Sequence, residues 1–309
     1  MNDLLKKTAI LLISILLLTM ASVSEASWRL DEDPELAEPR NFRMSSDNWR
    51  VEPEDEPPTR EGLDVLRASG SAQPTAAGFA SLYATLAAAA PGAPVYDIDL
   101  RQESHGFVDG MPVSWFEERN QANEGKTPEE VAADETARLS ALVGEESTFA
   151  PKEKNDKKRF DAVTVTPEKV QTEKETAEAA GFRYARFYVT DRAHPDTETV
   201  EAFLDFVESL PKDVWVHFHC HAGHGRTTTF LAMYDMIRNP DVSAEEIIER
   251  QYLIGGSDLT AMKKAEWKNE RIVRRLEMLR SFSRYIRAKH AGETTLRWSA
   301  WFEEEAEAA

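Results

Sequence analysis

A strand, a short loop and a helix follow one another without a break in residues 213–237, DVWVHFHCHAGHGRTTTFLAMYDMI. VWVHF is an apolar run of strand length, and apolar side chains return at helical spacing after the loop. The loop contains Cys220, the single cysteine of the chain, together with Gly223 and Gly225. The N–H groups of such a loop and the N-terminus of the next helix form an anion site. The sequence therefore predicts an anion-binding loop between a strand and a helix.

The same loop supplies a nucleophile. Its positive potential favours a thiolate, so we expect Cys220 to have a lowered pKa and to attack as a nucleophile. Arg226 closes the loop and can bind two phosphate oxygens, and Thr227 can donate a hydrogen bond to the sulfur. One alternative is an inert buried cysteine. The other is a metal site, although the histidines of the loop lie too close together to surround one ion without breaking the strand and the helix.

The first 26 residues predict a signal peptide. Lys6 and Lys7 precede an apolar run over 8–20, and the small residues Ser24 and Ala26 are placed for cleavage after Ala26. The run is short for a membrane span, and an uncleaved N-terminal anchor is the alternative. We therefore expect an exported protein, periplasmic or secreted, with no stable membrane association after the signal is removed. With one cysteine, it has no internal disulfide.

The net charge of −18 limits the kinds of molecule that the protein is expected to bind. Nucleic acid and anionic membrane surfaces are poor partners for so acidic a chain. A small anionic substrate is compatible with it, because a local basic pocket can override the net charge.

Strands and helices alternate along the chain, which is typical of an α/β fold with a mainly parallel central sheet flanked by helices. We expect strands at 95–100, 160–165, 182–189 and 214–219, and helices at 75–90, 167–180, 196–210 and about 261–289. The domain organisation that we expect is an acidic N-terminal arm at 27–60, a main domain at 61–290 with an insertion or small subdomain at about 106–159, and a solvated acidic tail at 291–309.

The cysteine loop and several other segments resemble one known family. HCHAGHGRT matches the HCxxGxxR(S/T) loop of cysteine-dependent protein tyrosine phosphatases, and HCHAGHGRTTTF most resembles the bacterial PTP-like phytases. Other segments look like that subfamily in the same order, between about Pro39 and Ile286: PRNFR, SGSAQPT, DLRQESHGFVDGMPVSWFEERNQANEGK, TDRAHP and RQYLIGG. The resemblance implies a protein tyrosine phosphatase-like fold with a small partial β-barrel-like subdomain. It also implies a hydrolase without metal or other cofactor that removes phosphates stepwise from myo-inositol hexakisphosphate through a phosphocysteine.

The leaving alcohol of a phosphate ester needs a proton, which a carboxylic acid can donate. From the residues alone, Asp191 competes for this role with Asp196 and other acids. The resemblance implies Asp191, because the family carries its acid on a mobile loop upstream of the cysteine strand. Family members often have a Trp and a His beside this Asp, whereas this chain has Arg192 and His194. A thiolate combined with a protonated acid predicts a bell-shaped pH–rate profile with an acidic optimum.

Further side chains are expected around a substrate with several phosphates. We expect the residues between Cys220 and Arg226 to bind the reacting phosphate, with their amides pointing inward: His221, Ala222, Gly223, His224 and Gly225. The resemblance implies that basic residues bind the other phosphates, and the candidates are Arg43, Lys157, Lys158, Lys263, Lys264 and Lys268. On a helix, Lys264 and Lys268 would lie one turn apart on one face. The residues expected to support the site are His219, Arg101, Glu103, His105 and His194. For Arg101 and Glu103, the alternative is an ion pair with a purely structural role.

Two other functions remain open at this point. The first is a protein tyrosine or dual-specificity phosphatase with the same catalytic residues and a different pocket mouth. The second is a catalytically silent phosphate-binding module, against which the intact set of Cys220, Arg226 and Asp191 argues. The clustered lysines near the C-terminus favour inositol phosphates over phosphotyrosine.

Overall fold

A computed structural model describes residues 26–117, 120–151 and 160–308. Apart from Ala26, the predicted signal peptide lies outside the described residues, and so do Lys157 and Lys158. Within the described part of the chain, no helix combines the length and the apolar character needed to cross a bilayer.

The central sheet is mainly parallel, which confirms the α/β prediction. Its strands lie in the order β10 (Arg183–Val189), β4 (Val95–Arg101), β11 (Trp215–Cys220), β3 (Ala68–Ala72) and β2 (Arg43–Met44). The first four are parallel to one another, and β2 pairs antiparallel at the edge. β11 lies in the middle and is buried along its whole length, as its apolar run requires. Cys220 therefore emerges at the carboxyl edge of the sheet, where ligands bind in α/β folds.

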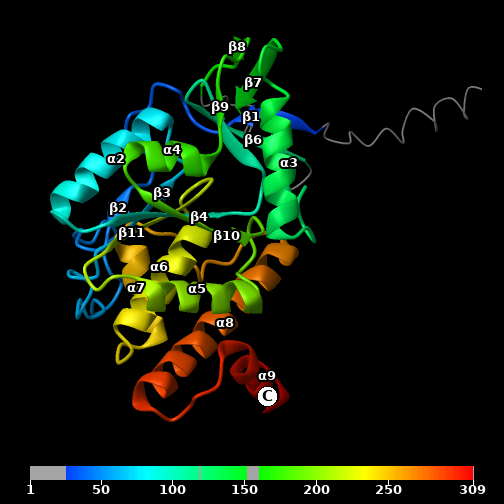
Figure 1. Ribbon diagram of the computed structural model, residues 1–309. Coiled ribbons are helices and arrows are strands. Elements are labelled where there is room, and N and C mark those ends of the chain that lie inside the picture. The colour runs from blue at the N-terminus through cyan, green and yellow to red at the C-terminus, as the bar shows by residue number, and fades with distance from the viewer. Residues whose placement is uncertain (1–25, 118–119, 152–159, 309) are drawn as a thin grey trace, which may run out of the picture.

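Helices cover both faces of this sheet (Figure 1). α2 (Ala76–Ala89) and α4 (Glu173–Ala180) lie on one face, where Phe79, Leu86 and Trp215 share a core. α5 (Thr197–Ser209) and α6 (Gly225–Arg238) lie on the other face over the largest core, and α7 (Ala244–Leu253) and α8 (Glu266–Ala291) pack against α6. The predicted helix at 75–90 is confirmed, and the Thr75 side chain caps it by accepting from the backbone N–H of Gly78 at 2.8 Å.

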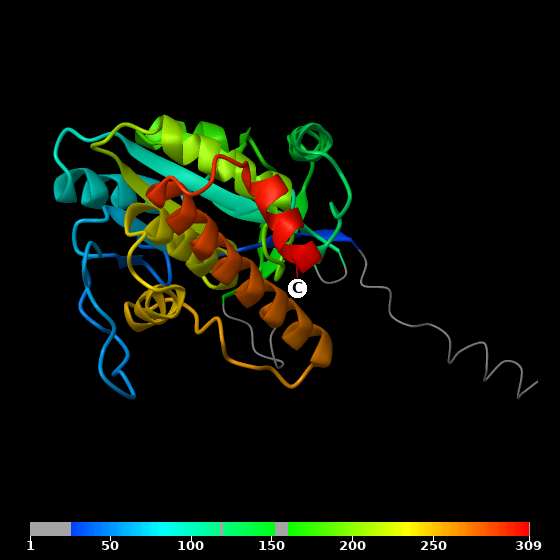
Figure 2. The ribbon, with the colours of Figure 1, turned by 90° about the horizontal axis from the view of Figure 1, so that it is seen from below.

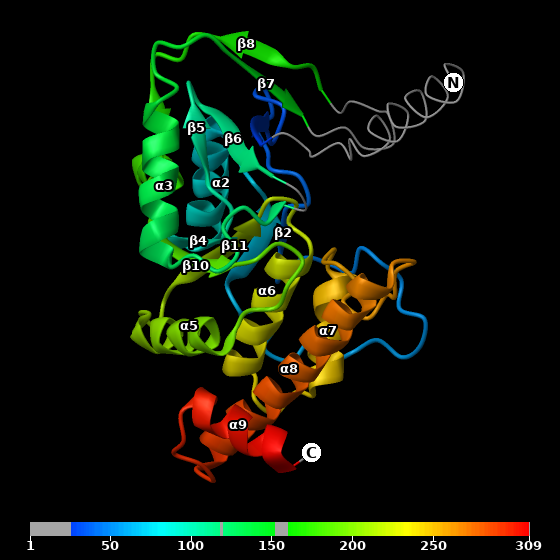
Figure 3. The same cartoon turned by 90° about the vertical axis from the view of Figure 1, so that its right-hand side faces the viewer.

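A second sheet forms the predicted small β subdomain. Its strands lie in the order β8 (Val163–Val165), β7 (Ser147–Pro151), β1 (Ser27–Leu30), β6 (Met111–Phe116), β5 (His105–Val108) and β9 (Val170–Gln171). α3 (Pro128–Ser140) packs beside it and contributes Leu139 to a separate core with Leu30 and Phe149. The subdomain draws on more of the chain than the expected 106–159, because β1 comes from the predicted N-terminal arm. Figure 3 shows this sheet and α3 above the central sheet, with α5 to α9 below it.

The C-terminal residues are not a solvated tail, and that prediction is wrong for the part of the tail that the structure describes. Residues Trp298–Ala308 form α9, which packs on α5 and α8. Figure 2 shows α9 beside the long α8. Trp298 is only 1% exposed and packs against Phe282 and Tyr285. The acidic side chains concealed this packing, because an amphipathic helix needs only one apolar face.

Candidate active site

The cysteine loop, residues 220–226, joins β11 to α6 as predicted. Gly223 has φ +70°, and a Cβ atom there would lie 2.4 Å from the backbone N of Ala72. Only glycine fits this position, because the loop passes so close to the end of β3 in a left-handed conformation. The Thr227 hydroxyl donates to Cys220 Sγ at 3.2 Å. The predicted contact between threonine and sulfur is therefore present.

The environment of Cys220 favours a thiolate. The side chain is only 4% exposed, and burial raises the pKa of the thiol. The charge of Arg226, the Thr227 hydroxyl and backbone N–H groups of the loop lower it by more, so that the pKa lies below its usual value. An inert buried cysteine would lack these donors.

Arg226 is fixed from behind by Glu103. Its guanidinium donates to both carboxylate oxygens of Glu103, at 2.7 and 2.9 Å, and to the backbone carbonyl of Val189 at 2.9 Å. Arg101 donates to the same carboxylate at 3.0 Å and to Asp31 at 2.9 Å. Arg101 and Glu103 thus form a buried ion pair, and Glu103 of this pair also contacts Arg226. Such two-point contacts hold a guanidinium in one orientation.

Asp191 lies beside the loop, and Asp196 does not. The Asp191 carboxylate is 3.2 Å from Nη2 of Arg226 and is 23% exposed. Asp196 caps α5 and accepts from the backbone N–H of Thr199 at 2.8 Å. A capping carboxylate is occupied by the helix N-terminus, so the geometry favours Asp191 of the two.

A cavity of about 780 Å³ opens above the cysteine loop. Asp31 and Asp191 are its acidic lining residues among those described. The basic ones are Arg29, Arg40, Arg192, Arg226, Lys263, Lys268, Arg271 and Arg275. A protein with a net charge of −18 thus concentrates positive charge where an anion would bind.

The structure brings nine of the predicted site residues into the lining of this cavity. Those that line it are Cys220, His221, Ala222, His224, Gly225, Arg226, Asp191, Lys263 and Lys268. Lys264 is exposed outside the lining residues. α8 begins at Glu266, so Lys264 lies in the preceding loop, and the prediction that it shares a helix face with Lys268 is wrong. His194 also lies away from the lining, with Nδ1 at 2.8 Å from the carbonyl of Pro195.

The prediction that Arg43 is one of the basic residues that bind the other phosphates is wrong, because its side chain does not line the cavity. It is 0% exposed beneath the cysteine loop and donates to the carbonyl of Gly223 at 3.0 Å and to Thr228 Oγ1 at 3.2 Å. Its side chain therefore supports the backbone of the cysteine loop and the start of α6. Conversely, Arg271 and Arg275 of α8 were missed. The sequence pattern that could have indicated them is a pair of arginines four residues apart in the predicted helix at about 261–289, which was also expected to carry the lysines.

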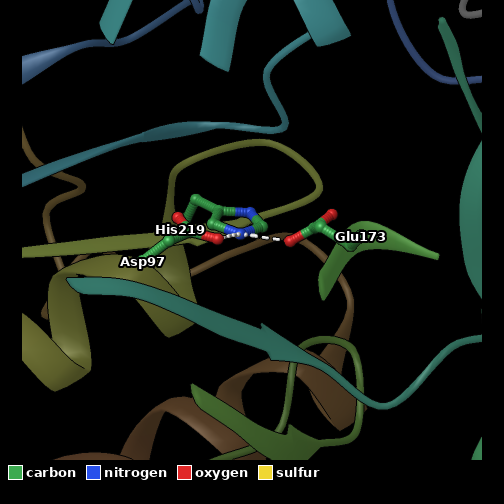
Figure 4. A group of neighbouring side chains, drawn as sticks. All are labelled: Asp97, Glu173 and His219. Atoms are coloured by element: carbon green, nitrogen blue, oxygen red, sulfur yellow. Dashed lines mark ion pairs between the residues drawn. The ribbon is translucent and has the colours of Figure 1, made fainter. Parts of the chain in front are cut away.

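His219 belongs to a buried ion network behind the loop. Its Nε2 lies 2.6 Å from Glu173 Oε1 and 3.5 Å from Asp97 Oδ2. Figure 4 shows the three side chains together. The other oxygen of Glu173 lies 3.1 Å from Nε2 of His105. Burial lowers the pKa of His219, but Glu173 and Asp97 raise it well above its usual value. Glu173 therefore lies between two imidazolium groups and joins α4 to β11.

The same side chains include two groups of metal-ligand type that share Glu173. Asp97 and His219 complete one group, and Asp99 and His105 complete the other. Burial lowers the pKa values of His105 and His219, but the carboxylates raise them by more, which favours protonated histidines as their counter-charges. Asp99 also pairs with Nε of Arg186 at 2.9 Å. The two protonated histidines and the Arg186 guanidinium carry the opposite charge to the three carboxylates. The network is therefore a set of buried ion pairs.

Comparisons with known proteins agree with this geometry. A family model described as "PTP-like phytase: Inositol hexakisphosphate" matches residues 98–238. The structure of the PTP-like phytase from Bdellovibrio bacteriovorus is similar, with a TM-score of 0.71 and 30% identity over 90% of this chain and 95% of that one. A PTP-like myo-inositol phosphatase from Mitsuokella multacida, solved with myo-inositol-(1,3,4,5)-tetrakisphosphate, gives a TM-score of 0.82 and 36% identity over 89% of this chain.

A curated relative, the effector protein hopD2 of Pseudomonas syringae pv. tomato, is 30% identical over 70% of this chain. This chain spans 48% of the length of hopD2 and 48% of the Mitsuokella chain. The likeness to these two proteins therefore concerns about half of each.

Proposed function

Because the chain belongs to the PTP-like phytase family, we propose that it is a phosphatase that removes phosphates stepwise from myo-inositol hexakisphosphate through a phosphocysteine. The observation that carries this proposal is that Cys220, Arg226 and Asp191 together line a basic cavity. No step of the proposed reaction requires a metal.

In the first step, Cys220 Sγ attacks phosphorus and forms an S–P bond while the P–O bond to the alcohol breaks. Arg226 and the loop amides stabilise the charge on the non-bridging oxygens. Asp191 gives its proton to the leaving oxygen. In the second step, the Asp191 carboxylate takes a proton from water, and the water oxygen displaces the thiolate from phosphorus. The hydrogen bond from Thr227 stabilises the departing sulfur.

The cavity lining supports a substrate with several phosphates. Lys263, Lys268 and Arg271 line the cavity from the region of α8, and Arg29 and Arg40 line it from the N-terminal segment. A monoester would engage only the cysteine loop and leave these cations without a ligand phosphate. The tetrakisphosphate bound by the Mitsuokella relative supports the same substrate class.

We also propose that the protein is exported after cleavage behind Ala26. β1 begins at Ser27 and pairs Ser27 with Phe116 of β6. Cleavage at that point would leave the small sheet intact.

The test compares phosphate release from inositol hexakisphosphate and from a phosphotyrosine peptide, with chromatography of the intermediates over time. We expect lower inositol phosphates to appear in sequence and the peptide to be a poor substrate. Cys220→Ser should reduce turnover by about 10³-fold or more while substrate still binds, because the nucleophile is lost but the cations remain. Preferred turnover of the peptide would favour a protein tyrosine phosphatase. Binding without phosphate release, unaltered in Cys220→Ser, would indicate a silent phosphate-binding module.

A further inference from the structure

Two arginines of α8 bind the backbone of the loop that carries Asp191. Nη1 of Arg271 donates to the carbonyl of Asp191 at 3.0 Å. Nη2 of Arg275 donates to the carbonyls of Arg192 and Ala193, at 3.1 and 3.0 Å. Three successive carbonyls thus accept from one helix. The two arginines reach them together, because residues four apart lie on the same helix face.

This loop has a conformation that its own sequence does not favour. Residues 190–193 form a tight turn in which the N–H of Ala193 donates to the carbonyl of Thr190 at 3.0 Å. Arg192 occupies the third position of the turn with φ 65°, a left-handed conformation that costs a non-glycine residue about 1–2 kcal/mol. The turn therefore needs contacts from outside to hold it, and α8 supplies them.

Arg275 also lies beside the cysteine loop. Its guanidinium is close to Gly225: a Cβ atom added there would lie 3.5 Å from Nη2 and 3.6 Å from Nη1. The residue is 6% exposed and lines the cavity with Cys220. Burial lowers the pKa of Arg275 to about 10, which leaves it charged at neutral pH. One buried cation therefore lies between the loop of the nucleophile and the loop of the acid.

We infer that Arg275 is a positioning residue for proton transfer: it holds the 190–193 turn against the cysteine loop so that the Asp191 carboxyl faces the leaving oxygen. This inference rests on the proposed function and deepens it. Without Arg275 the turn relaxes and the Asp191 carboxyl moves away from the leaving group. Small displacements of this kind are costly in rate, because proton transfer requires hydrogen-bond contact.

The test uses p-nitrophenyl phosphate and phenyl phosphate, which share a ring but differ in how much the leaving group needs a proton. The ratio of their kcat/KM values reports acid catalysis in the first step. Asp191→Asn should raise this ratio in favour of the nitrophenyl ester by about tenfold or more. Arg275→Met should raise it in the same direction by about three- to tenfold, and the double variant should add little to Asp191→Asn alone. Arg274→Met, an exposed arginine of the same helix, should leave the ratio unchanged.

An equal loss of kcat/KM on both esters in Arg275→Met would overturn the inference, because it would mean that Arg275 binds the phosphate itself. If Arg275→Met does not fold, Arg275→Lys is measured instead. It keeps the charge and one donor, and should give a smaller rise in the ratio; an unchanged ratio in a folded lysine variant with lowered activity overturns the inference too. If Asp191→Asn leaves the ratio unchanged while Cys220→Ser is inactive, the assignment of the acid fails, which is a separate outcome.

Discussion

At the scale of single residues, the chemistry of Cys220 depends on the groups within hydrogen-bond distance of it. Burial alone would suppress a thiolate, and Arg226, Thr227 and the loop amides reverse that effect. The same hydroxyl that favours the thiolate for attack also favours its departure in the second step. One donor therefore contributes to both halves of the proposed reaction.

We predict that Thr227→Val raises the pKa of Cys220, since the lost hydrogen bond stabilises only the charged sulfur. Because the pKa of Cys220 lies below its usual value, the wild-type protein should react with iodoacetamide at a lower pH than an ordinary thiol of pKa ~8.5. In Thr227→Val the alkylation profile should move to higher pH. The measurement is the alkylation rate against pH by mass spectrometry, which the single cysteine makes unambiguous. Thr227→Ser keeps the donor, so its alkylation profile should match that of the wild type. If the profile of Thr227→Val also matched the wild type, the Thr227 hydroxyl would not contribute to the lowered pKa of Cys220.

At the scale of elements, Glu173 joins α4 to β11 of the central sheet and to β5 of the small sheet. It contacts His219 of β11 and His105 of β5, and the Asp97 and Asp99 carboxylates of β4 lie beside these histidines. Burial and Arg101 lower the pKa of His105, but Asp99 and Glu173 raise it by more, to about 9. Charge pairing in the interior therefore links elements that are far apart in the sequence.

The sign of the pH effect follows from that shift. A histidine with a folded pKa of about 9 stabilises the fold fully below its unfolded pKa of about 6.5, and this stabilisation is lost as pH rises through about 9. The free energy of unfolding, measured with urea, should fall between pH ~7 and ~9.5. In His105→Gln that slope should be smaller. An equally steep slope in the variant would show that other groups cause it.

Removing the shared carboxylate should be costly. Glu173→Gln leaves two buried histidines without their common counter-charge and should lower the free energy of unfolding by about 3–5 kcal/mol at neutral pH. The matched control is Glu178→Gln, the same change at an exposed position of α4, which should alter stability by less than about 0.5 kcal/mol. Similar losses in the two variants would contradict the role given to Glu173.

At the scale of the whole molecule, net charge and local charge have opposite signs. The chain carries −18 overall, yet basic residues outnumber acidic ones in the lining of the cavity. Exposed charges more than about 8–10 Å apart are screened at ordinary salt concentrations, so the local lining decides substrate affinity. The effect of a lysine on substrate affinity should therefore depend on whether it lines the cavity, and not only on its contribution to the net charge.

Lys268→Gln and Lys264→Gln change the net charge equally, but only Lys268 lines the cavity. We predict that Lys268→Gln raises the KM for inositol hexakisphosphate by about three- to tenfold, because one charge-assisted phosphate contact is lost. Lys264→Gln should leave it unchanged, and neither substitution should affect the KM for p-nitrophenyl phosphate, which is small enough to bind at the cysteine loop alone. Equal effects of the two substitutions on the KM for the hexakisphosphate would indicate attraction by the overall charge instead.

The sequence alone determined the cysteine loop, the α/β fold and the segments that surround the site. These signals are local, because glycines, a cysteine and a periodic apolar run specify a strand–loop–helix unit within a short stretch. Only the tertiary structure decided which cations line the cavity. Arg43 is buried under the loop, Arg275 bridges two loops and Lys264 stays in solvent, although each is simply a basic residue near a family-like segment. A long basic side chain suits solvent, substrate or a buried carbonyl equally well. Which of these it meets depends on the packing of elements distant in sequence, and no local pattern contains that information.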